Sequence, residues 1–419
     1  MAPNGTIRGL RARTGRGHGL PSNAQGRSTR AILSSILGRI DRGSLEGRWS
    51  DGTEDEFIGA QAGDRARIEV LDESVLARSV VDGGALGLGA AYVEGAWSTP
   101  DLAGFLELAS RNVDGRQTSS AGARTANWAR SWWDKRPEFA RSHAIGEMGD
   151  HYNLGNDFYS LWLDESMTYS SALFEHDGVS LAEAQSAKYD SLCRMLDLQP
   201  GDRVLEIGCG WGGFMEYAAS NFDVRVTGLT LSEEMAIFAR KRLAEAGLSD
   251  RTEVKLQDFR DEPAMYDKVV SIEMIESVDE TVWPSLFHAI SRAIPPGGRA
   301  AMQAITIDER FYENLLVRED FIKRYIFPGG MLPTVEILRG RTAEAGRVWV
   351  EDEAHGEDYA ETLHRWAERF DSAWPAIVDH NADFDDRFRR MWQYYLEYCE
   401  AGFRTGRIDG IQFLMERPS

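Results

Sequence analysis

The chain has 419 residues, of which 42% are hydrophobic and 27% charged, an ordinary globular composition whose length suits two domains better than one. Acidic residues outnumber basic ones by 67 to 47, and the formal net charge of −20 disfavours a nucleic-acid partner. Three cysteines without disulfide or zinc spacing indicate a reducing, cytoplasmic compartment. No apolar run approaches the roughly 20 residues that span a bilayer, and the N-terminus lacks the apolar core of a signal peptide.

Residues 1–30 contain several arginines and no acidic residue, which predicts a disordered basic arm. A solvated tail explains this arm best, with contact to an anionic membrane as the alternative. Residues 31–115 predict a small α+β domain, with an amphipathic helix at 31–40, a strand at 66–70 and a glycine-rich helix at 84–93. Residues 116–144 read as a linker that carries a tryptophan-containing helix.

From residue 145 to 419 the pattern changes to buried strands that alternate with amphipathic helices. This alternation predicts an α/β fold with a doubly wound, mostly parallel sheet and helices on both faces. The expected strands are 203–207, 224–228, 253–256, 268–272 and 299–302.

A glycine turn follows the first of these strands, where the chain reads Glu206-Ile207-Gly208-Cys209-Gly210-Trp211-Gly212-Gly213. Glycines there allow a sharp turn and a close approach of ligand to backbone. On the glycines alone, a nicotinamide or flavin dinucleotide and S-adenosylmethionine are equally good candidates.

Three neighbouring features favour S-adenosylmethionine. Glu206 ends the strand directly before the loop, as the methyltransferase pattern requires. Gln257 and Asp258 end the third strand, where groups that bind adenine would sit. The second strand ends in Gly228 to Ser232, without the carboxylate that would hold a nicotinamide ribose.

The wider sequence resembles the cyclopropane fatty-acyl-phospholipid synthase family, which includes mycolic-acid cyclopropane synthases and enzymes that make methyl-branched fatty acids. The resemblance covers residues 145–417, and the N-terminal part is similar to the lipid-binding domain of longer members. The segments that carry it are 151–159, 167–171, 204–213, 228–232, 273–276, 323–333 and 401–404.

This resemblance implies a class I methyltransferase sheet with an insertion at about 306–345 that covers an acyl-chain channel. It also implies which residues lie beside the methionine end, the ribose and the adenine of the cofactor. With Glu206 and Gly212 of the glycine turn, the expected cofactor-binding residues are Tyr169, Ser170, Gly208, Gly210, Thr230, Leu231, Gln257 and Asp258.

Members of the family hold a bicarbonate ion beside the reacting carbons, and the corresponding positions here are Ser171, Glu276, Gln303, Ile305 and Tyr359. Glu276, Ile305 and Tyr359 match the family pattern, whereas Ser171 and Gln303 replace a cysteine and a histidine. The resemblance therefore implies bicarbonate as a second cofactor and assigns these five residues to catalysis.

The chemistry expected is attack of a cis alkene on the sulfonium methyl group, followed by loss of a proton from the resulting cation. A dry site with aromatic faces such as Tyr169, Phe327 and Tyr359 suits such a cation. A cyclopropane in a phospholipid acyl chain is the leading product, and a methylene or methyl-branched chain is the alternative. Methylation of a small soluble molecule and an inactive lipid-binding protein are the competing functions.

The remaining expectations concern partners and metals. A membrane phospholipid substrate implies peripheral contact with the inner face of the membrane. The oligomeric state is left open, with a homodimer as one candidate because the family often dimerises, and a methylene product would need a reductase partner. No metal site is expected, because His151 and His176 have no second ligand at helical or hairpin spacing.

Overall fold

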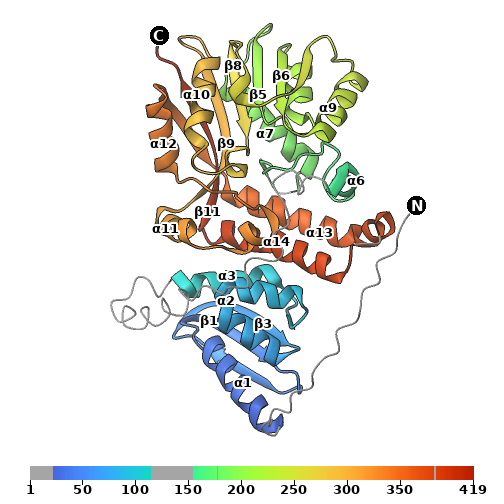
Figure 1. Cartoon of the computed structure of the whole chain (residues 1–419), viewed down its shortest axis with the longest axis vertical. Helices are drawn as coiled ribbons and strands as arrows, with labels where there is room; N and C mark the ends of the chain where they lie inside the picture. The colour runs from blue at the N-terminus through green and yellow to red at the C-terminus, as the bar shows by residue number, and fades with distance from the viewer. Residues whose placement is uncertain (1–21, 115–153, 177, 382–383) are drawn as a thin grey trace, which may run out of the picture.

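The computed structural model describes residues 22–114, 154–176, 178–381 and 384–419. Two separate sheets organise them: a four-stranded sheet near the N-terminus and a seven-stranded sheet in the remainder of the chain (Figure 1). The expected linker at 116–144 lies outside the described residues, as do residues 1–21 of the expected basic arm.

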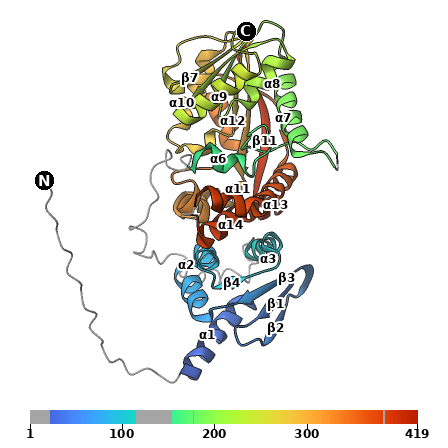
Figure 2. The same ribbon diagram turned by 90° about the vertical axis from the view of Figure 1, so that its right-hand side faces the viewer.

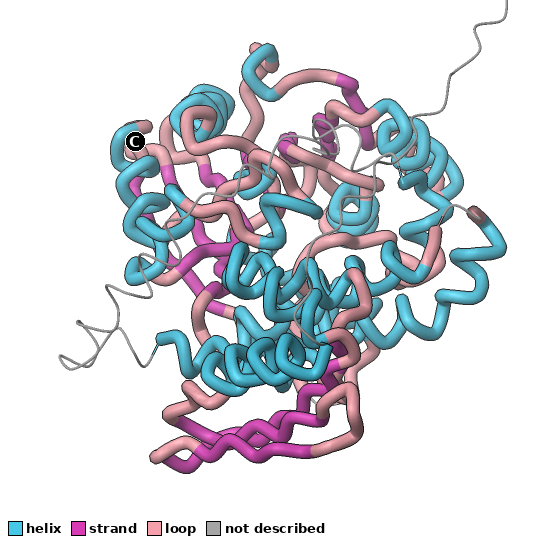
Figure 3. Tube along the Cα trace, turned by 60° about the horizontal axis from the view of Figure 1, so that its bottom comes forward, coloured by secondary structure: helices cyan, strands magenta, loops and turns pink. Residues whose placement is uncertain are grey.

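The N-terminal unit is a curved sheet covered on one face by helices, as the view in Figure 3 shows. Its strand order is β2-β1-β3-β4, with β1 parallel to β3 and antiparallel to β2. The first helix already begins at Ser22, so residues 22–30 of the expected disordered arm are helical. Arg30 fixes this helix to the sheet through Asp51 and Asp55. The elements are α1 (Ser22–Leu37), β1 (Arg42–Arg48), β2 (Glu54–Ile58), β3 (Gln61–Val70), α2 (Glu73–Val93), β4 (Trp97–Ser98) and α3 (Leu102–Asp114).

The large sheet has the order β10-β11-β9-β8-β5-β6-β7. The five strands from β9 to β7 are parallel, and β11 and β10 join antiparallel at the β9 edge. Parallel strands are buried on both faces and read as apolar runs, which is why the sequence predicts them well. The strands are β5 (Arg203–Ile207), β6 (Arg225–Thr230), β7 (Thr252–Leu256), β8 (Lys268–Ile272), β9 (Arg299–Ile307), β10 (Val348–Ala354) and β11 (Ile408–Glu416).

Helices cover both faces of this sheet, and several begin at side-chain caps. Ser180 and Glu183 form a capping box that starts α7, and the side chain of Ser232 caps α9 by accepting from the backbone N–H of Met235. The helices of this part are α6 (Gly155–Ser160), α7 (Leu181–Met195), α8 (Gly213–Asn221), α9 (Glu233–Glu245), η3 (Phe259–Asp261), η4 (Ile275–Ser277), α10 (Trp283–Ala293), α11 (Glu309–Val317), η5 (Ile322–Ile326), α12 (Val335–Glu344), α13 (Gly356–His380) and α14 (Asp386–Arg404).

The segment 306–345, expected as an insertion, starts at the end of β9 and contains α11, the short π-helical η5 and α12. Figure 1 places α11 beside α14, between the two sheets. The structure thus shows where this segment lies, while its role as the cover of an acyl channel stays a prediction.

The two units meet along α14, which packs on α2 and α3 (Figure 2). Arg390 of α14 donates hydrogen bonds to the carbonyl oxygens of Tyr92 and Trp97, and its guanidinium lies 3.9 Å from the ring centroid of Tyr92. Glu397, further along the same helix, accepts a 3.0 Å bond from the backbone N–H of Ala103. Burial raises the pKa of Glu397 to about 7. Polar groups that are matched across an otherwise apolar interface fix the register of the two units.

No helix in the described part of the chain is both long and apolar enough to cross a bilayer.

We expect Arg390→Ala to lower the free energy of unfolding by about 2–4 kcal/mol, because two buried carbonyl groups lose a charged donor. Urea denaturation followed by tryptophan fluorescence measures the change. Arg387→Ala is the matched control, since Arg387 lies on the same helix and forms its ion pair with Glu94 at the surface. Equal, small effects of both substitutions would contradict the role given to Arg390.

Candidate active site

The carboxyl ends of β5, β6, β7 and β8 lie along one edge of the large sheet, because these strands are parallel and adjacent. The glycine turn follows β5, Thr230 ends β6, Gln257 follows β7, and Glu273 follows β8. Ligands of open α/β sheets bind at this edge. The edge therefore brings together the groups that the sequence assigns to the cofactor.

The glycine turn leaves open space beside its backbone. Gly208, Gly210 and Gly212 have φ values of 84°, 48° and 82°, a left-handed conformation that residues with a Cβ rarely adopt. A Cβ on Gly210 would meet no atom within 4 Å, whereas one on Gly208 would lie 2.9 Å from Cγ of Met274. The backbone N–H groups at the start of α8 follow directly and favour polar or anionic ligand groups.

Glu206, at the end of β5, is a buried acid whose Oε2 has no hydrogen-bond partner among the described residues. Burial raises the pKa of Glu206 to about 8, and the nearby Lys188 partly offsets this. An unsatisfied buried acceptor of this kind fits a ligand that carries a positively charged ammonium or sulfonium group. The methionine end of S-adenosylmethionine is such a ligand.

Lys188 of α7 is a further residue of the site, and no sequence motif points to it. Its ammonium is fully buried and donates a 2.6 Å hydrogen bond to Oγ of Ser170. Burial lowers the pKa of Lys188 to about 7. A lysine inside an amphipathic helix normally faces solvent, so nothing in the local pattern distinguishes this one, which faces the cofactor edge.

The groups predicted for the ribose and adenine are already held by neighbours in the chain. Thr230 accepts a hydrogen bond from the backbone N–H of Ser232, and Gln257 donates one to Glu262. Asp258 binds Arg260 through both oxygens, which lowers the pKa of Asp258. Leu231 is 72% exposed. These contacts orient the residues along the edge.

Three segments of the chain converge on the carboxylate of Glu273. Its Oε1 accepts hydrogen bonds from the backbone N–H of Ser171 at 2.9 Å and from Nε2 of Gln303 at 2.7 Å. Its Oε2 accepts a 2.6 Å bond from the hydroxyl of Tyr359 on α13. Burial raises the pKa of Glu273, and the Tyr359 bond opposes that shift.

Glu276 lies three residues further on and has a different partner. Its Oε1 accepts a hydrogen bond from the backbone N–H of Ile305, and its buried Oε2 has no partner within the described part of the chain. Burial, with the adjacent Glu273 second, raises the pKa of Glu276 to about 8. Two close buried carboxylates disfavour a second negative charge. The negative charge is therefore more stable on Glu273, which has the donors, than on Glu276.

The sequence matches the family model described as mycolic acid cyclopropane synthetase over residues 140–413. The chain belongs to this family. It is 36% identical over 385 residues to the tuberculostearic acid methyltransferase UfaA1 of Mycobacterium tuberculosis, which covers 88% of this chain and 87% of that protein. It is 35% identical to the cyclopropane-fatty-acyl-phospholipid synthase of Escherichia coli over 81% of this chain and 85% of the relative.

Among solved structures, the mycolic acid cyclopropane synthase CmaA1 in complex with SAH and CTAB superposes with a TM-score of 0.60 and 30% identity, over 64% of this chain and 96% of that one. The MmaA2 cyclopropane synthase of Mycobacterium tuberculosis gives the same TM-score over 66% of this chain and 100% of that one. The protein is therefore an S-adenosylmethionine-dependent methyltransferase of the cyclopropane synthase type, with the class I methyltransferase fold.

The family pattern predicted a bicarbonate ion at this site, but the side chains present do not leave donors for one. The donors of Ser171, Gln303 and Tyr359 already bind Glu273, and the N–H of Ile305 binds Glu276. The hydroxyl of Ser171 donates to the carbonyl of Ala172 instead of facing an anion. An additional anion beside the charged Glu273 would be repelled.

Aromatic side chains connect the cofactor loop, residues 167–171, to the carboxylates. The hydroxyl of Tyr169 lies 2.6 Å from that of Tyr395, and the Tyr169 ring is 5.3 Å from Trp366. Tyr359 stacks on Phe403 at 4.3 Å, and Phe327 packs edge-on against Tyr395 at 6.0 Å. The aromatic lining expected from the sequence is thus present, although Tyr395 and Trp366 were not predicted.

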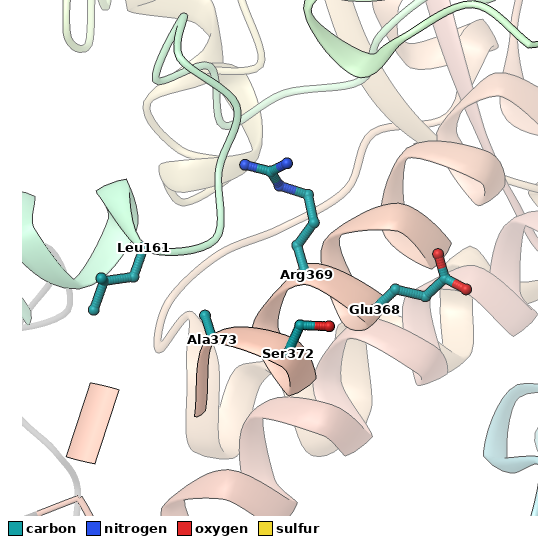
Figure 4. Close-up of a pocket in the computed structure, with 5 residues that line it drawn as sticks. All are labelled: Leu161, Glu368, Arg369, Ser372 and Ala373. Carbon is teal, nitrogen blue, oxygen red and sulfur yellow. The ribbon is translucent and has the colours of Figure 1, made fainter. Parts of the chain in front are cut away.

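A hollow on the outer side of α13 does not belong to this site. Figure 4 shows its lining, with Arg369 pointing towards the loop after α6. The guanidinium of Arg369 is already bound to the carbonyl oxygens of Trp162 and Leu163. The residues of the hollow are Leu161, Glu368, Arg369, Ser372 and Ala373. Within the described residues, no three His, Cys, Asp or Glu side chains are grouped as a metal would require.

We expect Gly210→Val to abolish binding of S-adenosylmethionine, because the new side chain would occupy the space open to the ligand. Isothermal titration calorimetry measures the affinity. Gly201→Val is the matched control, since Gly201 also has a positive φ and open space around it but lies in the turn before β5. Equal loss of binding in both variants would show that backbone strain, and not the ligand's space, is responsible.

We expect Glu276→Gln to flatten the pH dependence of stability between about pH 4.5 and 8. The folded wild type keeps a proton on Glu276 that the unfolded chain releases, so its stability falls as the pH rises through this window, by at most about 1.4 kcal/mol per pH unit. The raised pKa of Glu206 also lowers the stability as the pH rises, and it does so equally in the wild type and in the variant. Urea denaturation at about pH 5, 6, 7 and 8 measures the difference, and parallel curves would refute the protonated state of Glu276.

Proposed function

We propose that the enzyme methylates the cis double bond of an unsaturated phospholipid acyl chain and closes it to a cyclopropane. The observation that carries the proposal is the direct connection between the cofactor loop and a buried carboxylate. Ser170 is bound by Lys188 at the cofactor edge, and the adjacent Ser171 binds Glu273. A methyl donor and a proton acceptor can therefore act on neighbouring carbons of one substrate.

When bound, S-adenosylmethionine supplies an electrophilic methyl group. The π electrons of the alkene form the new C–C bond, and the adjacent carbon becomes a cation. Aromatic faces stabilise a cation without adding to it, which suits the rings of Tyr169, Tyr359 and Phe327. The hydroxyls of Tyr169 and Tyr359 are held by Tyr395 and Glu273, which restrains them from attacking the cation. Loss of a proton from the added methyl group then closes the ring.

A methylene or methyl-branched product is the second candidate, because the relative with 36% identity is named a tuberculostearic acid methyltransferase and its name mentions no ring. The same methyl transfer gives a methylene when a hydride first shifts from the methylated carbon to the cation and the added methyl group then loses its proton, whereas proton loss from a neighbouring chain carbon gives a methyl-branched alkene. A reductase partner belongs to this second candidate alone.

Peripheral contact with the inner face of the membrane follows from a phospholipid substrate and is part of the proposal. Leu316 and Val317 at the end of α11 are 40% and 78% exposed and are followed by Arg318, which suits a lipid interface. We also propose a homodimer by analogy with the family.

Expression of the protein in a host with unsaturated phospholipids tests the product. We expect a mass gain of one CH₂ per modified acyl chain and proton NMR signals of ring protons, upfield of all other lipid signals. If the spectrum shows the alkene signals of a methylene branch and no upfield signals, the product is the methylene chain of the second candidate and not a cyclopropane. Unchanged lipids, with cofactor binding intact, would refute lipid methylation.

A further inference from the structure

Glu273 occupies the position that an exchangeable anion would otherwise fill. A backbone N–H, an amide and a phenol, contributed by three segments far apart in the sequence, all donate to this one carboxylate. Hydrogen bonds to the charged form of an acid stabilise its charge. The three donors of Ser171, Gln303 and Tyr359 therefore form an anion-binding site, here the anion cradle, and the anion that occupies it is the side chain of Glu273.

The backbone of Glu273 adds an independent observation. Its φ is +46°, in the left-handed region, although the residue is not a glycine. The N–H of Glu273 still pairs with the carbonyl of Gln303 at 2.9 Å, so the chain leaves the sheet only at this residue. Strain of this kind persists where the surroundings require one side-chain position, and it occurs most often at functional sites.

The carboxylate also keeps a free basic position. Among the described residues Oε1 has two donors and Oε2 has one, Tyr359, whereas each carboxylate oxygen can accept two hydrogen bonds. Glu273 and Glu276 both retain accessible surface even though burial raises the pKa of both. Neither acid is completely enclosed, and Oε2 of Glu273 keeps an unused acceptor position for one proton.

We propose that Glu273 is the catalytic base of this enzyme and takes the place of bicarbonate. The inference rests on the proposed alkene methylation. A C–H bond of the added methyl group breaks, and its electron pair forms the C–C bond to the cationic carbon that closes the ring. For a methylene product, a hydride first shifts from the methylated carbon to the cation, and the same C–H electron pair then forms the C=C bond. The proton goes to Oε2 of Glu273, which becomes a neutral carboxylic acid and later releases that proton to water. Atoms and charge balance without any further reactant.

In this scheme Gln303, Tyr359 and the Ser171 N–H position the base, and the protonated Glu276 keeps a second charge away from it. Ser171 and Gln303, which depart from the family pattern, are explained by the same arrangement. An amide donates to a carboxylate at neutral pH without needing a proton from solution, as a histidine would.

The test compares three proteins in buffer depleted of carbon dioxide, with phospholipid vesicles that contain cis-unsaturated chains and with S-adenosylmethionine. Wild-type turnover should not depend on added bicarbonate. Glu273→Gln should lose turnover by at least about 10²-fold, the range of general-base assistance, with unchanged cofactor affinity. Glu280→Gln is the matched control, because Glu280 lies on the same segment and accepts a hydrogen bond from Tyr312, away from the cradle.

Glu273→Gly is the decisive variant. Glycine accepts the positive φ and leaves the three donors of the cradle unoccupied, so bicarbonate should bind there and restore turnover at least about tenfold. A purely structural role of Glu273 would not produce this rescue.

Three results would overturn the inference: bicarbonate dependence of the wild type, normal turnover of Glu273→Gln, or an inactive glycine variant that bicarbonate does not restore although it binds the cofactor. A wild type that binds the cofactor but modifies no lipid would instead refute the proposed function itself.

Discussion

The hydrogen bonds that meet at the carboxylate of Glu273 hold the catalytic part of this enzyme together. They join the loop before α7, the centre of β9 and the first turn of α13 to the end of β8. A buried charge is tolerated only when donors surround it, and the three donors here meet that requirement. The position of the cofactor loop and the position of α13 are therefore consequences of one electrostatic requirement.

The buried polar groups around this carboxylate follow the same logic. Gln303 donates to Glu273 and accepts from Gln412 of β11, so the antiparallel edge of the sheet is connected to the site. Lys188 is near Glu273 and Glu206 and partly compensates both carboxylates. Among these acids, unsatisfied oxygens remain at Glu206 and Glu276 within the described structure, at the two places where we expect ligands. The hydrogen-bond network around Glu273 thus leaves acceptor oxygens without partners beside the expected ligands.

Much of the large sheet is predictable from the sequence, and the reason is burial. The strands at 203–207 and 268–272 have buried apolar runs of the right length, and these two strands and the one at 253–256 end where the structure ends them. The first helix was expected about nine residues too late, because its N-terminal turns are polar and contain a glycine. β10 was not predicted, since it is an exposed edge strand rich in acidic residues.

The cofactor-binding residues were assigned from the sequence, because a glycine turn and its flanking residues are local in the sequence, and their contacts with the cofactor stay a prediction. The choice between Glu273 and Glu276 was not predictable. The two acids are three residues apart, and only the left-handed backbone at Glu273 directs its side chain to Ser171, Gln303 and Tyr359. That conformation depends on segments 30 to 102 residues away, which no local pattern records.

The α14 helix is shared by both halves of the molecule. Tyr394 packs against Tyr92 of the N-terminal unit and against Phe321, while the next residue, Tyr395, bonds to Tyr169 at the cofactor loop. A shortened protein that began after the N-terminal unit would therefore leave an aromatic strip of α14 in water, one residue away from the tyrosine that bonds to Tyr169. Minimal versions of this enzyme for biotechnology would need this strip redesigned with polar residues, even though every residue assigned to catalysis would still be present.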